Sequence, residues 1–235
     1  MDVRAVLADV AELGPYFAVT PGPGVGGAGW RPVRELYSDP APVRERIAQV
    51  GTALGSDARV AASIAFQGLA AQLVSAPFAA VALHGVLPRL GADALCWRPV
   101  HSGPWPLGCA EPAGAAVGSG AAGGAALAAL LLVEHLQPLV AVVREQVSIA
   151  ERVLWGNAAS ALAGAKRMVG VTRPEAADAA ARLAATVLDV GPLRGAGEKL
   201  PPIDPDRGWT FRRRSCCLYY RVGGLCEDCV LLVDR

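Results

Sequence analysis

Residues 212–229 read RRRSCCLYYRVGGLCEDC, and this run decides how the end of the chain folds. It holds four of the six cysteines of the chain, namely Cys216, Cys217, Cys226 and Cys229. Cys226 and Cys229 are three residues apart, so one tight turn can present both sulfurs. Gly223 and Gly224 allow the chain to fold back between the two cysteine pairs, because glycine adopts backbone conformations that other residues avoid. We therefore expect the four sulfurs to converge.

Four converging thiolates match the needs of a 2Fe–2S cluster, which takes two ligands on each iron. Neighbouring side chains in an extended strand point to opposite faces. Cys216 and Cys217 must therefore sit in a bent backbone or bind different irons. The sequence predicts a 2Fe–2S cofactor held by four ligands, Cys216, Cys217, Cys226 and Cys229.

Basic residues surround the cysteines, and their charge supports the same interpretation. A cluster with four thiolates carries negative charge, which nearby cations offset, and favourable charge near a cluster raises its potential. The same cations can steer an acidic electron donor toward the site. These residues are Arg212, Arg213, Arg214 and Arg221.

Two other interpretations of the cysteines stay open. A zinc site with four thiolates also uses a C-x2-C turn, although such sites normally bring two of these turns and no Cys-Cys pair. Disulfides or free thiols are the second alternative.

The residues after Met1 carry charge where a secretory signal needs an apolar stretch, so we expect a cytoplasmic protein. In that compartment cysteines are usually free, catalytic or metal-bound.

Composition predicts a folded chain with a large core. Hydrophobic residues make up 53% and charged residues 18%, the opposite of a disordered chain. The net charge of +1 argues against general binding to nucleic acid. The stretches 60–88 and 112–133 contain no charged residue, and we expect both to form buried core helices. A weak peripheral membrane contact is the alternative.

Hydrophobic periodicity and capping residues predict a predominantly α fold of the α+β class. Expected helices cover 2–13, 41–54, 57 to about 74 with a restart at Pro77, 122–169 with a restart around Pro138, and a last helix capped by Thr172 and ending near Gly191. Short extended segments are expected at 16–20 and 93–107. We expect a helical, ferric-reductase-like domain at 1–200. An irregular cluster-binding segment at 201–235 packs on it.

Two segments resemble a known family. The run from Arg213 to Arg221 gives Arg-Arg-Ser-Cys-Cys-Leu-Tyr-Tyr-Arg, and the run 225–232 continues with the C-x2-C turn. Upstream, the segment 153–160 contains Leu-Trp-Gly-Asn. Together they resemble the ferric-siderophore reductase family, the FhuF-type proteins. The family spacer between the cysteine pairs is about ten residues, and a shorter loop is readily tolerated; here the spacer has eight residues.

The resemblance implies a cytoplasmic reductase that transfers one electron to the ferric ion of a siderophore, of the hydroxamate class, and so releases ferrous iron. It also implies an external electron-donor protein, such as a ferredoxin or a reductase. An electron carrier or iron–sulfur sensor without a siderophore site is the alternative function. No catalytic residue is singled out by the sequence.

The remaining candidate residues each have a structural alternative. The segments 24–29 and 118–123 match G-x-G-x-x-G, but neither has the context of a dinucleotide site, and both are expected to be loops. Trp155 and Asn157 either line a siderophore pocket or belong to the core. The core is the favoured place for the other candidates, which are Trp97, Trp105, His101, His84, His135, Cys96 and Cys109.

Overall fold

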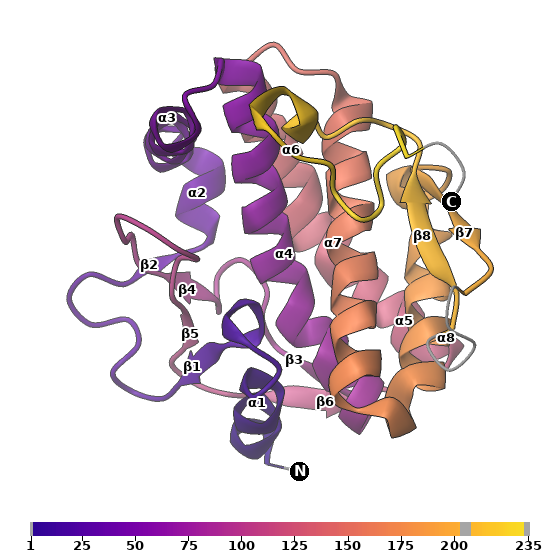
Figure 1. Cartoon of the computed structure of the whole chain (residues 1–235). Coiled ribbons are helices and arrows are strands. Elements are labelled where there is room, and N and C mark those ends of the chain that lie inside the picture. Colours follow the sequence, from indigo (N-terminus) through magenta and orange to yellow (C-terminus); the bar gives the residue numbers. More distant parts are fainter. Residues whose placement is uncertain (1, 203–207, 233–235) are drawn as a thin grey trace.

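The longest element is the helix α4 (Ala58–His84), which runs through the middle of the molecule. The second long helix, α7 (Glu151–Thr172), lies beside it (Figure 1). The computed structural model describes residues 2–202 and 208–232. The other α-helices lie around this pair: α1 (Val3–Ala11), α2 (Arg34–Ser38), α3 (Ala41–Leu54), α5 (Ala121–Ala129), α6 (Gln137–Gln146) and α8 (Ala177–Leu188).

Helix α4 is a core helix because its sequence is apolar on every side. Its buried residues run from Val60 to Ala82 without forming a single stripe, which is typical of a helix surrounded by protein. Asp57 caps its first turn by accepting hydrogen bonds from the amides of Arg59 and Val60, as the sequence predicts. Gly85 ends it with a φ of +62°, a conformation that suits glycine.

Proline does not interrupt α4. The sequence predicts a restart at Pro77, and this prediction is wrong, since the helix continues through Pro77 to His84. Proline removes one backbone hydrogen bond and crowds the preceding turn. Complete burial of its neighbours, such as Ala76 and Phe78, holds the helix together across that point. Tertiary packing therefore overrides the local preference.

The stretch from α5 to α6 is also continuous. A π-helical segment, η2 (Leu130–Leu136), joins the two helices, and Pro138 lies in the first turn of α6 without a break. The predicted restart around Pro138 is therefore wrong. A π turn is wider than an α turn, which relieves the contact between a proline ring and the preceding carbonyl groups.

Two helical stretches are long and apolar enough to cross a membrane by length and composition alone, Ala58–His84 and Ala121–Gln146. In the most apolar window of the first, 78% of the residues are buried inside the protein, and in the second 56%. The first is the core helix α4. Because buried core helices pass the same test, this finding by itself assigns no membrane segment.

The described strands form three small sheets. In the largest, with the order β1-β5-β4-β2, only the pair β1–β5 is parallel. The two-stranded sheets β3–β6 and β7–β8 are antiparallel. The strands are β1 (Val19–Pro21), β2 (Arg31–Pro32), β3 (Val86–Pro88), β4 (Cys96–Trp97), β5 (Leu107–Cys109), β6 (Gly114–Ala116), β7 (Gly197–Leu200) and β8 (Thr210–Arg213). The predicted α+β class, with helices predominating, is confirmed.

The chain after α7 differs from the sequence prediction in two ways. Thr172 is the last residue of α7 and not the cap of the next helix, because the Arg173 amide closes one more turn on Val169. A 3₁₀ turn at Pro174–Ala176 then leads into α8. Beyond α8, a hairpin of β7 and β8 replaces the expected irregular connector. Strand β7 belongs to the predicted helical domain at 1–200, and β8 belongs to the predicted cluster-binding segment at 201–235. The two strands pair with each other across the predicted boundary.

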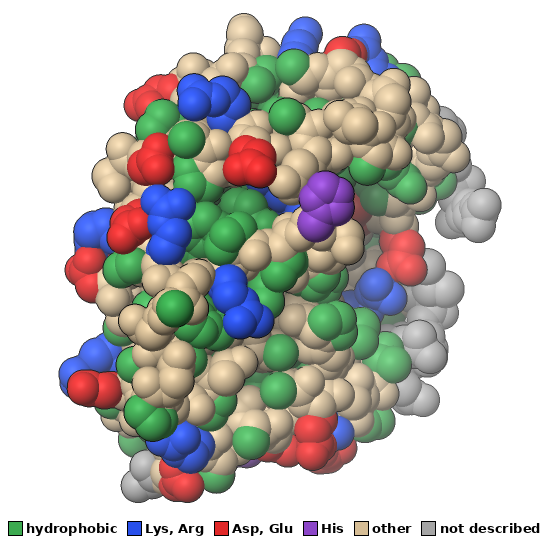
Figure 2. All heavy atoms as spheres, turned by 90° about the vertical axis from the view of Figure 1, so that its left-hand side faces the viewer, with side chains coloured by type: hydrophobic (Ala, Val, Ile, Leu, Met, Phe, Trp, Pro, Cys, Tyr) green, Lys and Arg blue, Asp and Glu red, His purple; other side chains and the backbone are tan. Residues whose placement is uncertain are grey.

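Charged side chains are scattered over the face shown in Figure 2, where red and blue groups of opposite sign lie next to each other among hydrophobic groups. No broad basic area is visible on that face. Binding of nucleic acid relies on such an area. The expectation about nucleic acid drawn from the net charge of +1 stays a prediction.

The π-helical segment holds a buried histidine, whose bonds fix its protonation state. His135 Nε2 lies 2.7 Å from the Leu90 carbonyl oxygen and must donate to it. Nδ1 lies 2.9 Å from the Tyr37 hydroxyl, which can then donate to Nδ1 only if the ring is neutral. Burial lowers the pKa of His135 below its ordinary value of 6.5. His135 is the satisfied core histidine that the sequence predicts.

We expect His135 to make the protein less stable in mild acid. Below pH 6.5 the unfolded chain binds a proton at this ring while the folded chain does not, so the free energy of unfolding falls as the pH falls. The slope from one such group reaches at most about 1.4 kcal/mol per pH unit. Urea unfolding between pH 5 and pH 8 should show this slope in the wild type and a smaller one in His135→Gln. This range extends about one pH unit or more to either side of the ordinary pKa of the ring. Equal slopes in both proteins would contradict the assignment.

Candidate iron–sulfur centre

The cysteine segment lies against one end of α4 and α7, and it brings cysteines from both pairs together (Figure 1). The Sγ atoms of Cys217 and Cys226 are 3.3 Å apart. Cys217 and Cys229 are each only 2% exposed, whereas Cys216 and Cys226 are half-buried. One residue of each pair therefore faces the interior and the other lies near the surface.

Tight turns orient the sulfurs toward backbone amides. The Leu218 amide donates to Cys216 Sγ at 3.3 Å, and the Leu231 amide donates to Cys229 Sγ at 3.4 Å. Leu218 has a φ of +70° and is the only non-glycine residue with positive φ among the described residues. A bulky residue rarely adopts this conformation unless its surroundings impose it. The bend that the Cys-Cys pair requires is therefore made at the next residue.

The Cys217 and Cys226 thiols share a hydrogen bond. This contact lowers the pKa of Cys217 and, together with burial, raises the pKa of Cys226. The Tyr219 amide and the positive charge of Arg213 also lower the pKa of Cys217. Burial raises the pKa of Cys216. Because metal ligation requires thiolates, the lowered pKa of Cys217 suits this residue to it.

Arg213 is the cation that lies among the cysteines. Its side chain is fully buried, and its Nη1 donates to Asn157 Oδ1 at 2.7 Å. Its Nη2 donates to Ser160 Oγ and lies 3.2 Å from Asp228 Oδ2. Its Nε has no hydrogen-bond partner among the described residues. A buried guanidinium with spare donor capacity is suited to a neighbour of high negative charge.

Helix α7 supplies the polar groups that hold this segment. Asn157 Nδ2 donates to the backbone oxygen of Ser63 at 2.8 Å, and Ser63 Oγ donates to the Cys217 backbone oxygen at 2.7 Å. Trp155 is buried, and its indole donates to Glu151 at 2.9 Å. Of the two interpretations of Trp155 and Asn157, the structure therefore supports the core one, since Asn157 bonds within the protein and supports the cysteine segment.

The other three arginines of the run play different parts. Arg212 pairs with Glu198 of the neighbouring strand β7 at 2.7 Å, and Arg214 is exposed. Arg221 pairs with Asp57, the cap of α4, at 3.1 Å. Only Arg213 is buried among the cysteines. The predicted offset of cluster charge therefore rests mainly on Arg213.

Comparison with known families agrees with this geometry. The family described as ferric iron reductase FhuF-like transporter matches residues 114–194, and the FhuF 2Fe-2S C-terminal domain matches residues 213–231. The two matches support the resemblance to FhuF-type proteins. The second match covers all four cysteines and Arg213, and the first covers the α7 residues that bind them. A search of curated proteins gave no match.

Both matches support a ferric iron reductase, and the second supports a 2Fe–2S cluster. The cluster supplies one-electron chemistry. Four thiols suit such a group, because a two-iron centre takes two ligands on each iron. Of the four, the structure brings Cys217 and Cys226 together, with 3.3 Å between their Sγ atoms. Among the described residues, no three His, Cys, Asp or Glu side chains converge as a single metal ion would require. The ligand set remains a prediction.

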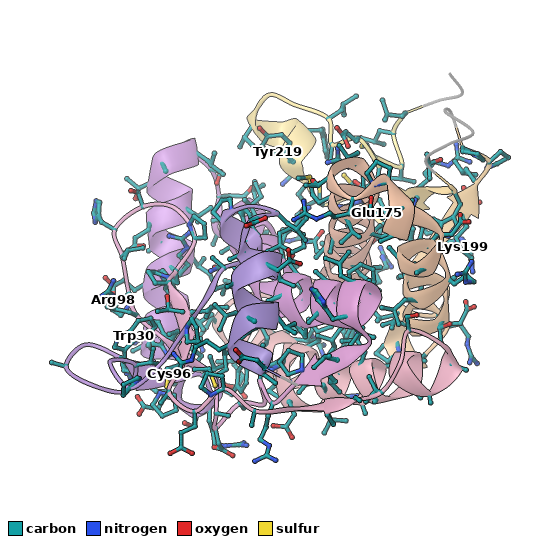
Figure 3. All side chains as sticks on the ribbon, turned by 90° about the horizontal axis from the view of Figure 1, so that it is seen from below. Trp30, Cys96, Arg98, Glu175, Lys199 and Tyr219 are labelled. Carbon is teal, nitrogen blue, oxygen red and sulfur yellow. The ribbon has the colours of Figure 1, made fainter. Side chains whose placement is uncertain are left out.

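Cys96 and Cys109 lie away from the cluster segment. Figure 3 shows Cys96 at the far side of the molecule from Tyr219, near Trp30 and Arg98. Cys96 lies on β4 and Cys109 on β5, and burial raises the pKa of both thiols. The prediction that they are ordinary thiols agrees with this placement.

The aromatic cluster and the glycine-rich segments are also structural. Trp97 and Trp105 stack at 4.5 Å in the core, whereas His101 is exposed and not part of the core. The segment 24–29 is a loop, as predicted. The segment 118–123 runs into α5, which corrects its prediction as a loop, but the preceding strand β6 pairs antiparallel with β3. A dinucleotide site needs a parallel βαβ unit.

The cysteine segment exposes a group of large hydrophobic side chains. Their exposed fractions lie between 37% and 52%, and they are Tyr219, Tyr220, Leu225, Val230 and Leu231. Figure 3 shows Tyr219 on the outer side of the cysteine segment. Exposed apolar groups concentrated in one segment mark a contact surface. We call this group the tyrosine–leucine patch.

Helix α7 approaches the cysteine segment closely at Gly156. A Cβ atom on Gly156 would lie 2.1 Å from Ser215 Oγ but 3.5 Å from Ser215 Cβ. Ser215 Oγ itself donates to the Arg152 backbone oxygen at 2.9 Å. Glycine therefore lets the residue before the Cys-Cys pair dock on the helix. The sequence Leu-Trp-Gly-Asn contains this glycine, but it does not indicate that Ser215 packs against it.

We expect Gly156→Ala to loosen the cysteine segment and lower the iron content of the purified protein. The clash involves the Ser215 hydroxyl alone, so the double variant Gly156→Ala, Ser215→Ala should recover most of the iron. Ser215→Ala alone should lose about 1 kcal/mol or less, the usual contribution of one hydrogen bond. Iron analysis of the three proteins tests this coupling. Equal iron loss in the single and double variants would contradict it.

Proposed function

We propose that this protein reduces the ferric ion of a siderophore in the cytoplasm, and that the siderophore is of the hydroxamate class. Hydroxamate oxygens are hard donors that hold ferric iron tightly and ferrous iron much less well. A 2Fe–2S cluster held by the four cysteines would supply the one electron that the ferric ion gains, and the weakened complex would then release ferrous iron. The observation that carries the proposal is a predicted cluster site with one buried and one half-exposed cysteine in each pair.

The residues of the chain contribute position and charge. Arg213 places a positive charge beside the thiolates, which favours the gain of an electron at the cluster. Ser63 and Asn157 fix the backbone at Cys217. Burial of Cys217 and Cys229 keeps water away from one side of the site. The half-exposed Cys216 and Cys226 leave the other side open to exchange electrons.

The electrons come, in this proposal, from another protein. The two glycine-rich segments lack the parallel βαβ context of a nucleotide site in the described part of the chain. The tyrosine–leucine patch of the cysteine segment supports a protein donor, because exposed aromatic and aliphatic groups are typical of protein contact surfaces. A ferredoxin or a reductase is the expected donor.

A single-turnover experiment tests the proposal. Cluster-loaded protein is reduced with dithionite, freed of excess reductant without air, and mixed with ferrioxamine B, a ferric hydroxamate. We expect the visible spectrum to return to that of the oxidised protein while a ferrous chelator captures one ferrous ion for each electron lost. The gallium complex of the same ligand is the control, since gallium(III) does not accept the electron.

The alternative function predicts another outcome. An electron carrier or sensor without a siderophore site should stay reduced when ferrioxamine B is added, yet be oxidised at once by ferricyanide. That result would overturn the reductase proposal for hydroxamates.

A further inference from the structure

A surface groove lies between three helix ends on the side of α4 that faces α3. It has a volume of about 540 Å³, and it is formed by the second half of α3, the start of α4 and the end of α6. Pockets for small molecules usually measure about 300–1,000 Å³. Because of its volume and its position near the cysteine segment, we propose that this groove binds the ferric chelate. The inference rests on the proposed function and adds the substrate site to it.

The lining suits a neutral or anionic ligand with oxygen atoms on its surface. Arg44 is the only ionisable residue among those that line the groove, and no carboxylate lines it. Thr52 and Gln146 add polar groups, and the Oγ atom of Ser56 is buried without a hydrogen-bond partner among the described residues. An unpaired buried hydroxyl can accept a ligand as its partner without losing an internal bond.

A ferric hydroxamate complex has the matching surface. Three hydroxamate anions neutralise one ferric ion, so the complex carries no strong positive charge that Arg44 would repel. Its outer surface combines methylene chains with amide and hydroxamate oxygens. Ile47 and Ala61 offer apolar contact, and Arg44, Ser56 and Gln146 offer donors. A ligand with free carboxylates would also pair with Arg44.

The groove lies one helix away from the cysteines. Ala61 lines the groove, whereas Ser63, two residues further along α4, donates to the Cys217 backbone oxygen at 2.7 Å. Residues two apart lie on nearly opposite sides of a helix, whose diameter with side chains is about 10 Å. A chelate in the groove is therefore separated from the Cys217 backbone by about that thickness.

The rim of the groove contacts the cysteine segment directly. Asp57 lies between Ser56 and Ala58, two lining residues, and its carboxylate pairs with Arg221 at 3.1 Å. Arg221 belongs to the spacer between the two cysteine pairs. The groove and the tyrosine–leucine patch have no residue in common.

Filling the groove tests the inference. Ala48 lines it and is exposed, so Ala48→Trp should occupy part of its volume without disturbing the core. Ala53 is an exposed residue of the same helix outside the groove, and Ala53→Trp is the matched control. Binding of the gallium(III) complex of N-acetyl-desferrioxamine B, which carries no net charge, to cluster-loaded protein is measured by calorimetry, which needs no electron transfer.

We expect Ala48→Trp to weaken binding of the gallium chelate about tenfold or more, and to raise the KM for ferrioxamine B by a similar factor. Ala53→Trp should match the wild type in both measurements. Oxidation by ferricyanide should be unchanged in all three proteins, because the cysteine segment is untouched.

Two results would overturn the inference. One is equal affinity of Ala48→Trp and the wild type for the gallium chelate, and the other is a wild type that does not bind it. Reduction of ferrioxamine B by the wild type is scored separately. If the wild type reduces the chelate while Ala48→Trp binds it normally, the proposed function stands and the groove is not the site.

Discussion

The Cys217→Ala protein should be purified colourless and almost free of iron, whereas the wild type should be reddish-brown with two iron atoms per chain, as a 2Fe–2S centre requires. Loss of one thiolate leaves an iron without its full ligand set. Its reductase activity should vanish with the colour. Iron and sulfide analysis, together with the visible spectrum, measures the effect.

Cys217 is the most informative of the four cysteines because it is the one most firmly placed. Its side chain is only 2% exposed, its Sγ lies 3.3 Å from that of Cys226, and its backbone oxygen is bound by Ser63. The structure offers no spare thiol nearby, since Cys96 lies across the molecule (Figure 3). Its removal cannot be compensated by another ligand within the described residues.

Cys96→Ser is the matched control for this experiment. It also removes a partly buried thiol, but from strand β4, and we expect full colour and iron content. A Cys217→Ala protein that kept both iron atoms and its colour would show that Cys217 is not a ligand. The predicted set of four would then have to be abandoned.

Local chemistry explains why much of the fold was predictable. The helix at 41–54 was predicted with the bounds of α3, because proline at its start and Gly55 at its end mark its limits. The cap of α4 was predicted from Asp57 for the same reason. The cysteine spacing likewise predicts its turns. Each of these features depends on residues that are close together in the sequence.

Features that depend on distant residues could not be predicted. Asn157 and Ser63 are 94 residues apart, and Arg213 and Asn157 are 56 apart, yet they form one buried network. Periodicity describes each helix separately, so it recognises α4 and α7 but not the polar contacts between them. The continuity of α4 through Pro77 has the same origin, since surrounding helices stabilise it. The Leu-Trp-Gly-Asn segment is recognisable in the sequence, but its contact with Ser215 is not.

Substitution of Arg213 should have the second large effect, because this side chain both forms buried hydrogen bonds and carries a positive charge beside the thiols. Arg213→Met leaves Asn157 and Asp228 without their buried partner, which typically costs about 3–5 kcal/mol of stability. It also removes the positive charge beside the thiolates, so reduction becomes harder and the midpoint potential falls. We expect a fall of roughly 60 mV, a tenfold change in a one-electron equilibrium. Urea unfolding and a mediated redox titration of cluster-loaded protein measure the two effects.

Arg213→Lys separates the two contributions. Lysine keeps the charge but lacks the planar fork that binds Asn157 and Ser160 together. We therefore expect stability to fall by about 2 kcal/mol while the potential stays near that of the wild type. Arg214→Met, at the exposed neighbouring position, is the control and should change both quantities little. If Arg213→Met and Arg214→Met shifted the potential equally, the charge would act from the surface at large, and the buried guanidinium would serve structure alone.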